Sequence, residues 1–426
     1  MAVGGNSDSN NLTVVEQSAY LNPPFSYLFS ILLPTKEQTS LLQACLWSGR
    51  RGERAWAEWR EDIGDPARFL REDSDGVKGL LALLFHSLQN KNVSIDKEFQ
   101  TYLRTAFLRD ELRSKAYSRI CRDVTSTLTS AGISTVLLKG AALAETAYPL
   151  PVLQHSHYLD ILVNDDDLPR TVNLLTSLGF TWSSEANGYE WKKYELVHES
   201  GLPLLLHRRL FALPFFQIPV EEFWARSRIQ MMSGVPTRLL SPADNLFHTC
   251  SSVFDEEQPD SLRWVCDAWF IIHLCPDLDW DLLIDCARRS HTVLPLFVTV
   301  NYLADALKAP IPSRVLTQLG DAVSNANEIR REAALFSAQT SSRGGLMKIL
   351  RSCTDWRTLA SVVQWALFPS PAYLRWIHDI RYSWLLPFYY PYRPFKFVVR
   401  QMWFFARRQM RLLSGNTLQQ EAELKP

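Results

Sequence analysis

The sequence predicts a mixed α/β (α+β) fold, in which a mixed-sheet core is flanked by N-terminal and C-terminal helical regions. Three observations lead to this prediction. Apolar residues recur at helical spacing through the first quarter of the chain, short β-branched runs take over near residue 132, and helical spacing returns beyond residue 219. Hydrophobic residues make up 46% of the 426 residues and charged residues 21%, so the chain can form a large buried core.

The expected domain organisation follows the same changes of pattern. A chain of this length is typical of two or three domains. The expected segments are a disordered tail at 1–20, a helical region at 21–131, the core at 132–240, a second helical region at 241–380 and a basic aromatic tail at 381–426. The 45 basic and 45 acidic residues balance, which argues against a nucleic-acid binder that relies on bulk charge.

Cysteines and targeting signals favour a cytoplasmic protein. The seven cysteines are widely spaced and form no CxxC pair, so we expect free thiols rather than a disulfide framework or a zinc ribbon. The first residues, MAVGGNSDSNN, lack the basic and apolar regions of a signal peptide. The sequence also lacks an uncharged apolar run of about 18 residues, so we expect no transmembrane helix.

Helices are expected before and after the core. In the first region, apolar spacing predicts helices over 37–51, 74–90 and 96–131, the last of them stopped by Gly132. Beyond Pro219 we expect helices again as far as about residue 367. Among these, Ser241 is expected to cap a helix that starts at Pro242, and 261–274 forms a Trp-rich helix.

The core is expected to alternate strands and helices. Residues 133–138 (ISTVLL) and 158–163 (YLDILV) are short apolar runs typical of strands, and the helix-forming AALAETAY lies between them. Further strands are expected at 181–182, 191–198 and 202–206, and a helix at 165–178, whose start the acidic residues Asp165, Asp166 and Asp167 are expected to cap.

Two features of the core suggest chemistry. A strand that runs through Lys139 and Gly140 into a helix brings backbone N–H groups and the positive end of the helix together, which favours phosphate. Asp160 lies inside an apolar strand, where a carboxylate needs a metal, a cation or a hydrogen-bond donor. The alternatives are an ordinary turn at Gly140 and a solvent-facing side chain at Asp160.

Four segments in a fixed order resemble one family. LLKGAALAETAYP, YLDILV, LLLHRRL and LRWVCDAWFII occur in this order between residues 136 and 272. They resemble the uncharacterised bacterial nucleotidyltransferase family of the LKG…DxDxLV type, within the superfamily of DNA polymerase beta-like nucleotidyltransferases. The resemblance implies a nucleotidyltransferase-like core and transfer of a nucleoside monophosphate from a nucleoside triphosphate to an unknown acceptor.

The resemblance also implies roles for individual residues. Lys139, Gly140 and Ala141 would hold the triphosphate. Asp160 would bind Mg²⁺ or Mn²⁺ in a two-metal reaction, because such folds use carboxylates as metal ligands. His207 and Arg209 would support catalysis by contacting phosphate or by orienting Asp160.

The sequence departs from the family pattern at the metal ligands. The first Asp of the DxD pair is replaced by Tyr158, and the often acidic position before His207 is Leu205, so one of three expected carboxylates remains. The arginine that the family pattern has before the DxD pair falls near His155 in this sequence. His155 and His157 could together bind a softer metal, but two histidines beside one aspartate are only a weak indication of a metal site. A second hypothesis therefore stays open: a catalytically degenerate protein that binds a nucleotide, a partner or a membrane surface. Asp267 is expected to anchor arginine or tryptophan side chains, and the alternative is a role in the wall of the active site.

The C-terminal tail suggests an anionic partner. Between 381 and 413 no acidic residue interrupts seven cationic ones, and aromatic residues are interleaved with them. The cationic residues are Arg381, Arg393, Lys396, Arg400, Arg407, Arg408 and Arg411. Such a segment fits an anionic membrane surface or single-stranded nucleic acid, and would make the protein peripheral to a membrane. The alternative is a helix that packs its aromatic face while the arginines reach solvent.

Overall fold

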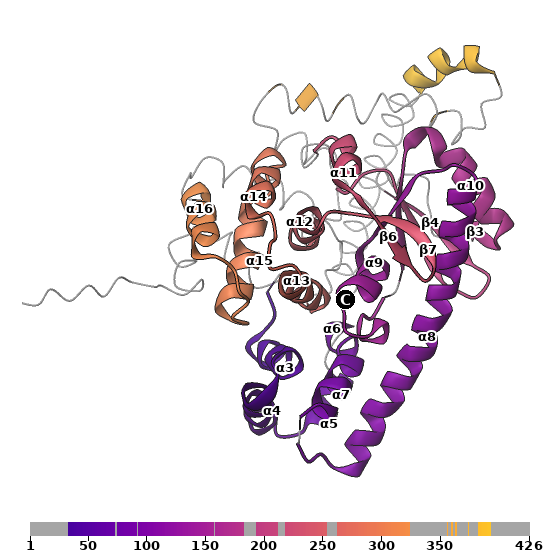
Figure 1. Cartoon of the computed structure of the whole chain (residues 1–426). Coiled ribbons are helices and arrows are strands. Elements are labelled where there is room, and N and C mark those ends of the chain that lie inside the picture. Colours follow the sequence, from indigo (N-terminus) through magenta and orange to yellow (C-terminus); the bar gives the residue numbers. More distant parts are fainter. Residues whose placement is uncertain are drawn as a thin grey trace, which may run out of the picture. The chain divides into compact units, whose positions relative to one another are not determined.

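The computed structural model describes residues 33–72, 75–91, 93–156, 158–182, 193–211, 218–253 and 262–323, together with 356, 359–360, 363, 374 and 382–392. The chain divides into two units, residues 1–356 and 357–426. The first unit holds all the described strands and most of the described helices (Figure 1).

Seven strands of the described residues form one mixed sheet in the order β3-β4-β5-β2-β1-β7-β6. Their bounds are β1 Thr135–Leu138, β2 Leu159–Val163, β3 Phe180–Trp182, β4 Lys193–His198, β5 Pro203–His207, β6 Arg228–Met232 and β7 Val235–Leu239. β1 is parallel to β7 and β2 is parallel to β5, while the other neighbouring pairs are antiparallel. The predicted α+β class with a mixed sheet is confirmed.

The central strands are buried on both faces. Every residue of β1 and β2 is buried, as expected where continuous apolar runs are covered from both sides. The helices α9 (Lys139–Thr146) and α8 (Lys97–Ser130) contact β1, and α9 also contacts β2. Asp160 is therefore carried by a strand at the centre of the sheet.

The N-terminal helices partly follow the prediction. The long helix over 96–131 is confirmed as α8, whose first N–H groups are capped by Asp96. The helix expected over 37–51 is wrong in extent, because α3 (Lys36–Leu46) ends at Trp47 and a second helix, α4 (Gly49–Ile63), begins after Ser48. The remaining helices here are α5 Pro66–Glu72, α6 Asp75–Lys78 and α7 Leu81–Gln89, so the single helix expected over 74–90 is interrupted.

The segment after residue 219 contains a hairpin that the sequence interpretation missed. The helix α11 (Val220–Arg226) is short, and β6 and β7 follow it where further helix was expected. Ser233 and Gly234 join the two strands with φ angles of 47° and 85°. Two connecting residues with positive φ angles are typical of a tight hairpin turn, so the Ser-Gly pair was the overlooked signal.

The C-terminal helices of the first unit agree with the prediction. The Ser241 hydroxyl accepts a hydrogen bond from the backbone N–H of Asp244 at 3.2 Å, which confirms the expected cap. The Trp-rich helix over 261–274 is confirmed as α13. The helices are α12 Pro242–Ser252, α13 Arg263–Leu274, α14 Trp280–Arg289, α15 Val293–Asp305 and α16 Ser313–Val323.

In the second unit, the described residues include a short 3₁₀ helix, η4 (Ser383–Leu385), and a small apolar cluster around Leu374 and Leu386. The disordered tail expected at 1–20 and the seven cationic residues of 381–413 lie outside the described residues. Binding of that segment to an anionic surface stays a prediction. None of the described helices combines the length and the apolar character that crossing a membrane requires.

Candidate functional site

The first part of the site is the junction between β1 and α9. The helix begins at Lys139, directly after the last residue of β1, so Gly140 and Ala141 lie in its first turn. Lys139 has a φ of 51°, in the left-handed region that residues with a side chain rarely adopt. This sharp turn keeps the strand and the N-terminus of α9 adjacent, and the first amide groups of a helix favour an anion.

Position 140 has to be a glycine because a neighbouring side chain leaves no room for a Cβ atom. A Cβ atom at Gly140 would lie 2.7 Å from both the Oε1 and the Nε2 atoms of Gln154, which is closer than real contacts allow. Gln154 follows the 3₁₀ helix η1 (Pro151–Leu153), and its Nε2 donates a 3.3 Å hydrogen bond to Asp267 Oδ1. The side of Gly140 on which a Cβ would stand is therefore covered by the amide of Gln154.

Asp267 joins the helix α13 to this turn. The Tyr148 hydroxyl donates a 2.6 Å hydrogen bond to Asp267 Oδ1, and both side chains are buried. Burial, followed by the negative charge of Asp267, raises the pKa of Tyr148 well above its ordinary value. Asp267 thus anchors Tyr148 and Gln154.

The second part of the site is the pair Asp160 and His207. Asp160 is aligned with Leu205 in the parallel pairing of β2 and β5, and His207 lies two residues further along β5, on the same face. The Nε2 atom of His207 lies 2.6 Å from Asp160 Oδ1, with 1% and 5% of the two residues exposed. The sheet therefore brings together two residues that the sequence had proposed, and His207 orients the Asp160 carboxylate.

Among the residues that the structure describes, the carboxylates needed for two divalent ions do not gather around Asp160. Tyr158 is partly exposed and Leu205 is buried. The acidic residue on the same face, Glu195 of β4, is aligned with Leu205, so two strand spacings, about 9.5 Å, separate its backbone from that of Asp160. Within the described ranges, no group of three or more His, Cys, Asp or Glu side chains is arranged to hold a metal ion. The described residues do not fit a two-metal site.

Arg208 and Arg209 follow His207 at the end of β5. Arg208 forms a bidentate ion pair with Asp165, and its Nε atom lies 2.6 Å from Asp165 Oδ1. Asp165, Asp166 and Asp167 form the 3₁₀ helix η2 (Asp165–Asp167) directly before α10 (Leu168–Ser177), so they lie at the helix start as expected. Asp167 occupies the N-cap position, but its side chain makes no capping hydrogen bond. Arg209 is half-buried, and its pKa is lowered by burial and then by the charge of Arg208.

His155 pairs with a residue that the sequence interpretation did not consider. Its Nδ1 atom lies 3.0 Å from Oδ2 of Asp110, a buried residue of α8, and Arg109 binds the other oxygen at 3.1 Å. Burial raises the pKa of Asp110, but the hydrogen bonds and charges of His155 and Arg109 outweigh it, so the pKa is lowered overall. His157, the other proposed ligand, lies outside the described residues.

Comparison with known proteins gives one family and one solved structure. Residues 76–308 match the model of a family described as an uncharacterised nucleotidyltransferase. The chain also resembles the crystal structure of an antigenic nucleotidyltransferase-like protein from Paracoccidioides brasiliensis, with 18% identity and a TM-score of 0.32, over 47% of this chain and 96% of that one. No curated protein matches the sequence.

Proposed function

We propose, from the premise that this chain belongs to the uncharacterised nucleotidyltransferase family, that it binds a nucleoside triphosphate at the β1–α9 junction and transfers the nucleoside monophosphate to an acceptor. The matched residues are more than half of the chain and include all four motif segments. The observation that carries the proposal is the turn at Lys139, whose φ of 51° sets the first amide groups of α9 directly at the end of β1. Lys139 adds a positive charge there.

The proposed roles within this site differ from residue to residue. Lys139 and the backbone of Gly140 and Ala141 hold phosphate oxygens. Asp160 and His207 form a buried acid–histidine pair. The pair lies near the end of β1, where α9 begins, because Asp160 is aligned with Leu138, the last residue of β1. The described residues complete no two-metal site, so the tests compare conditions with and without Mg²⁺ or Mn²⁺.

A second candidate function is nucleotide binding without transfer. The specific observation in its favour is that the one retained carboxylate, Asp160, is buried and bonded to His207, while Tyr158 and Leu205 stand where the family pattern expects acidic residues. Mg²⁺ prefers several oxygen ligands, so this set favours binding over catalysis on chemical grounds. Both candidates share the phosphate site.

The first test is the thermal stability of the full chain with ATP, GTP, CTP and UTP, each with and without Mg²⁺ or Mn²⁺. A nucleotide at about 100 times its dissociation constant stabilises the folded state by about 2.7 kcal/mol. Lys139→Ala should remove the shift. Lys308→Ala is the matched control, because Lys308 also has a positive φ, of 56°, and therefore carries a similar backbone cost. No shift with any nucleotide, or equal shifts in both variants, would contradict the phosphate site.

The second test separates the two candidates. Incorporation of labelled nucleoside monophosphate into a broad acceptor pool, lost in Asp160→Asn, would support transfer. Nucleotide binding without incorporation under any metal condition would select the second candidate. In that case Tyr158→Asp combined with Leu205→Glu should create Mn²⁺ binding that the natural chain lacks, because the two carboxylates then join Asp160 on one face.

A further inference from the structure

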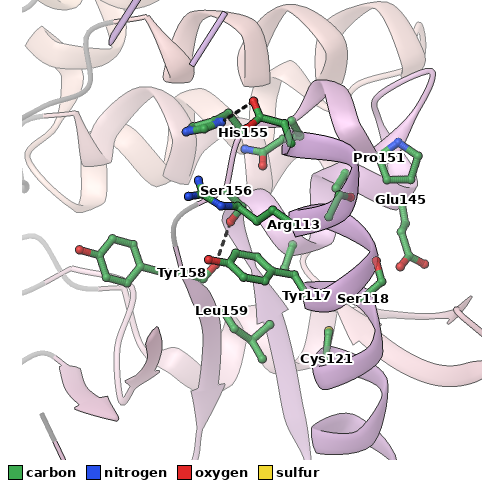
Figure 2. A pocket seen from close by; sticks show the side chains of 15 residues that line it. Arg113, Tyr117, Ser118, Cys121, Glu145, Pro151, His155, Ser156, Tyr158 and Leu159 are labelled. Atoms are coloured by element: carbon green, nitrogen blue, oxygen red, sulfur yellow. Dashed lines mark hydrogen bonds and ion pairs between the residues drawn. The ribbon is translucent and has the colours of Figure 1, made fainter. Parts of the chain in front are cut away.

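A small cavity lies between α8, α9 and the loop that leads into β2. Its volume is about 40 Å³. Figure 2 shows Arg113, Tyr117 and Ser118 along α8, with Tyr158 directly before β2. Leu159, the first residue of β2, also lines this cavity.

One wall of the cavity holds a buried acceptor without a hydrogen-bond partner. Gln154 lines the cavity and is only 4% exposed. Its Nε2 atom donates to Asp267, but among the described residues its Oε1 atom finds no hydrogen-bond donor. A buried polar atom in this state costs free energy unless a water molecule or a ligand donates to it.

The other polar groups define which ligand fits. Asp110 and Glu145 contribute negative charge, while Arg113 of the lining and Arg109, which is paired with Asp110, contribute positive charge, so the lining favours a neutral ligand over an ion. The lining also offers hydroxyl groups, which both donate and accept hydrogen bonds. These belong to Ser114, Tyr117, Ser118 and Ser156. A volume of about 40 Å³ holds about three water molecules, which is the size of a three-carbon polyol.

We propose that this cavity binds a small neutral polyol, with one hydroxyl donating to Gln154 Oε1 and the others bonded to the serine and tyrosine hydroxyls. This binding does not require nucleotide transfer. The cavity nevertheless borders the proposed phosphate site, because Ala141 of the first turn of α9 lines it.

The experiment measures glycerol binding to the full chain by saturation-transfer NMR, with 1-propanol as a comparator of equal carbon number. We expect a saturable glycerol signal and a weaker one for 1-propanol. Gln154→Met keeps the length of the side chain and removes the acceptor, so the dissociation constant should rise about fivefold. Ala144→Trp fills the cavity from α9 and should abolish the signal. Ala116→Trp, at an exposed position of α8 outside the cavity, is the matched control and should keep it.

Three results would overturn the proposal: no saturable glycerol signal, equal binding of 1-propanol, or unchanged glycerol binding in both cavity variants. Thermal unfolding of each variant checks that it is folded. If Ala144→Trp does not fold, Gln154→Met still decides the outcome. The nucleotide titration is independent, so glycerol binding without nucleotide binding would refute only the proposed function, and the reverse result only the polyol site.

Discussion

Replacement of Gly140 by alanine tests how the β1–α9 junction is built. The added Cβ would lie 2.7 Å from both terminal atoms of the Gln154 amide and 2.9 Å from its Cδ. A flexible side chain would simply move aside, but Gln154 is buried and bonded to Asp267. The amide must therefore shift within a packed interior and weaken that hydrogen bond.

The magnitude follows from two opposing effects. Overpacking of a buried site costs about 1–3 kcal/mol. Alanine returns up to about 1 kcal/mol relative to glycine within a helix. We expect Gly140→Ala to lower the free energy of unfolding by about 1–2 kcal/mol in urea titrations followed by tryptophan fluorescence. In a Gln154→Ala background the obstacle is absent, and the same change should be neutral or stabilising by up to about 1 kcal/mol.

A matched control is available in α16. A Cβ at Gly320 would meet its nearest atom, in Phe297, at an ordinary 3.7 Å, so Gly320→Ala should not destabilise the protein. The cycle of Gly140 and Gln154 variants should give a coupling of about 1–3 kcal/mol. An equal cost of Gly140→Ala in both backgrounds would refute the reasoning, because the cost would then not arise from Gln154.

Three further predictions concern buried charges. Tyr148→Phe removes the 2.6 Å hydrogen bond to Asp267, and we expect urea titration to show a loss of about 1.5–3 kcal/mol. Arg226→Ala leaves the fully buried Asp244 without the two nitrogens that bind it at 2.8 and 3.0 Å, so the same assay should show a loss of about 3–5 kcal/mol. The pKa of Asp110 is lower in the folded protein than in the unfolded chain, where it is about 4, so the ionised carboxylate stabilises the fold at pH values above about 4. This stabilisation is lost as the pH falls through the pKa of Asp110 in the folded protein. Asp110→Asn should therefore be less stable at pH 7 and lose less stability between pH 5 and pH 2, as measured by unfolding at each pH.

Local sequence patterns predicted much of the fold. Apolar spacing and capping residues gave α8, α12 and α13, because these helices depend mainly on neighbours three or four positions away. The hairpin of β6 and β7 was missed because β6 has four exposed residues and no apolar alternation toward a core. The break between α3 and α4 was missed because the second helix is rich in charge, and only its packing identifies Trp56 and Trp59 as its buried face.

The sequence by itself determined the strand–turn–helix at Lys139 and the strand that carries Asp160, because both depend on short stretches of chain. Only the tertiary structure decided their partners. His207 lies 47 positions from Asp160, and the amide of Gln154 reaches Asp267 across 113 positions. Strand register and helix packing fix such contacts through burial of apolar surface along the whole core, and no local pattern records which polar side chains that burial brings together.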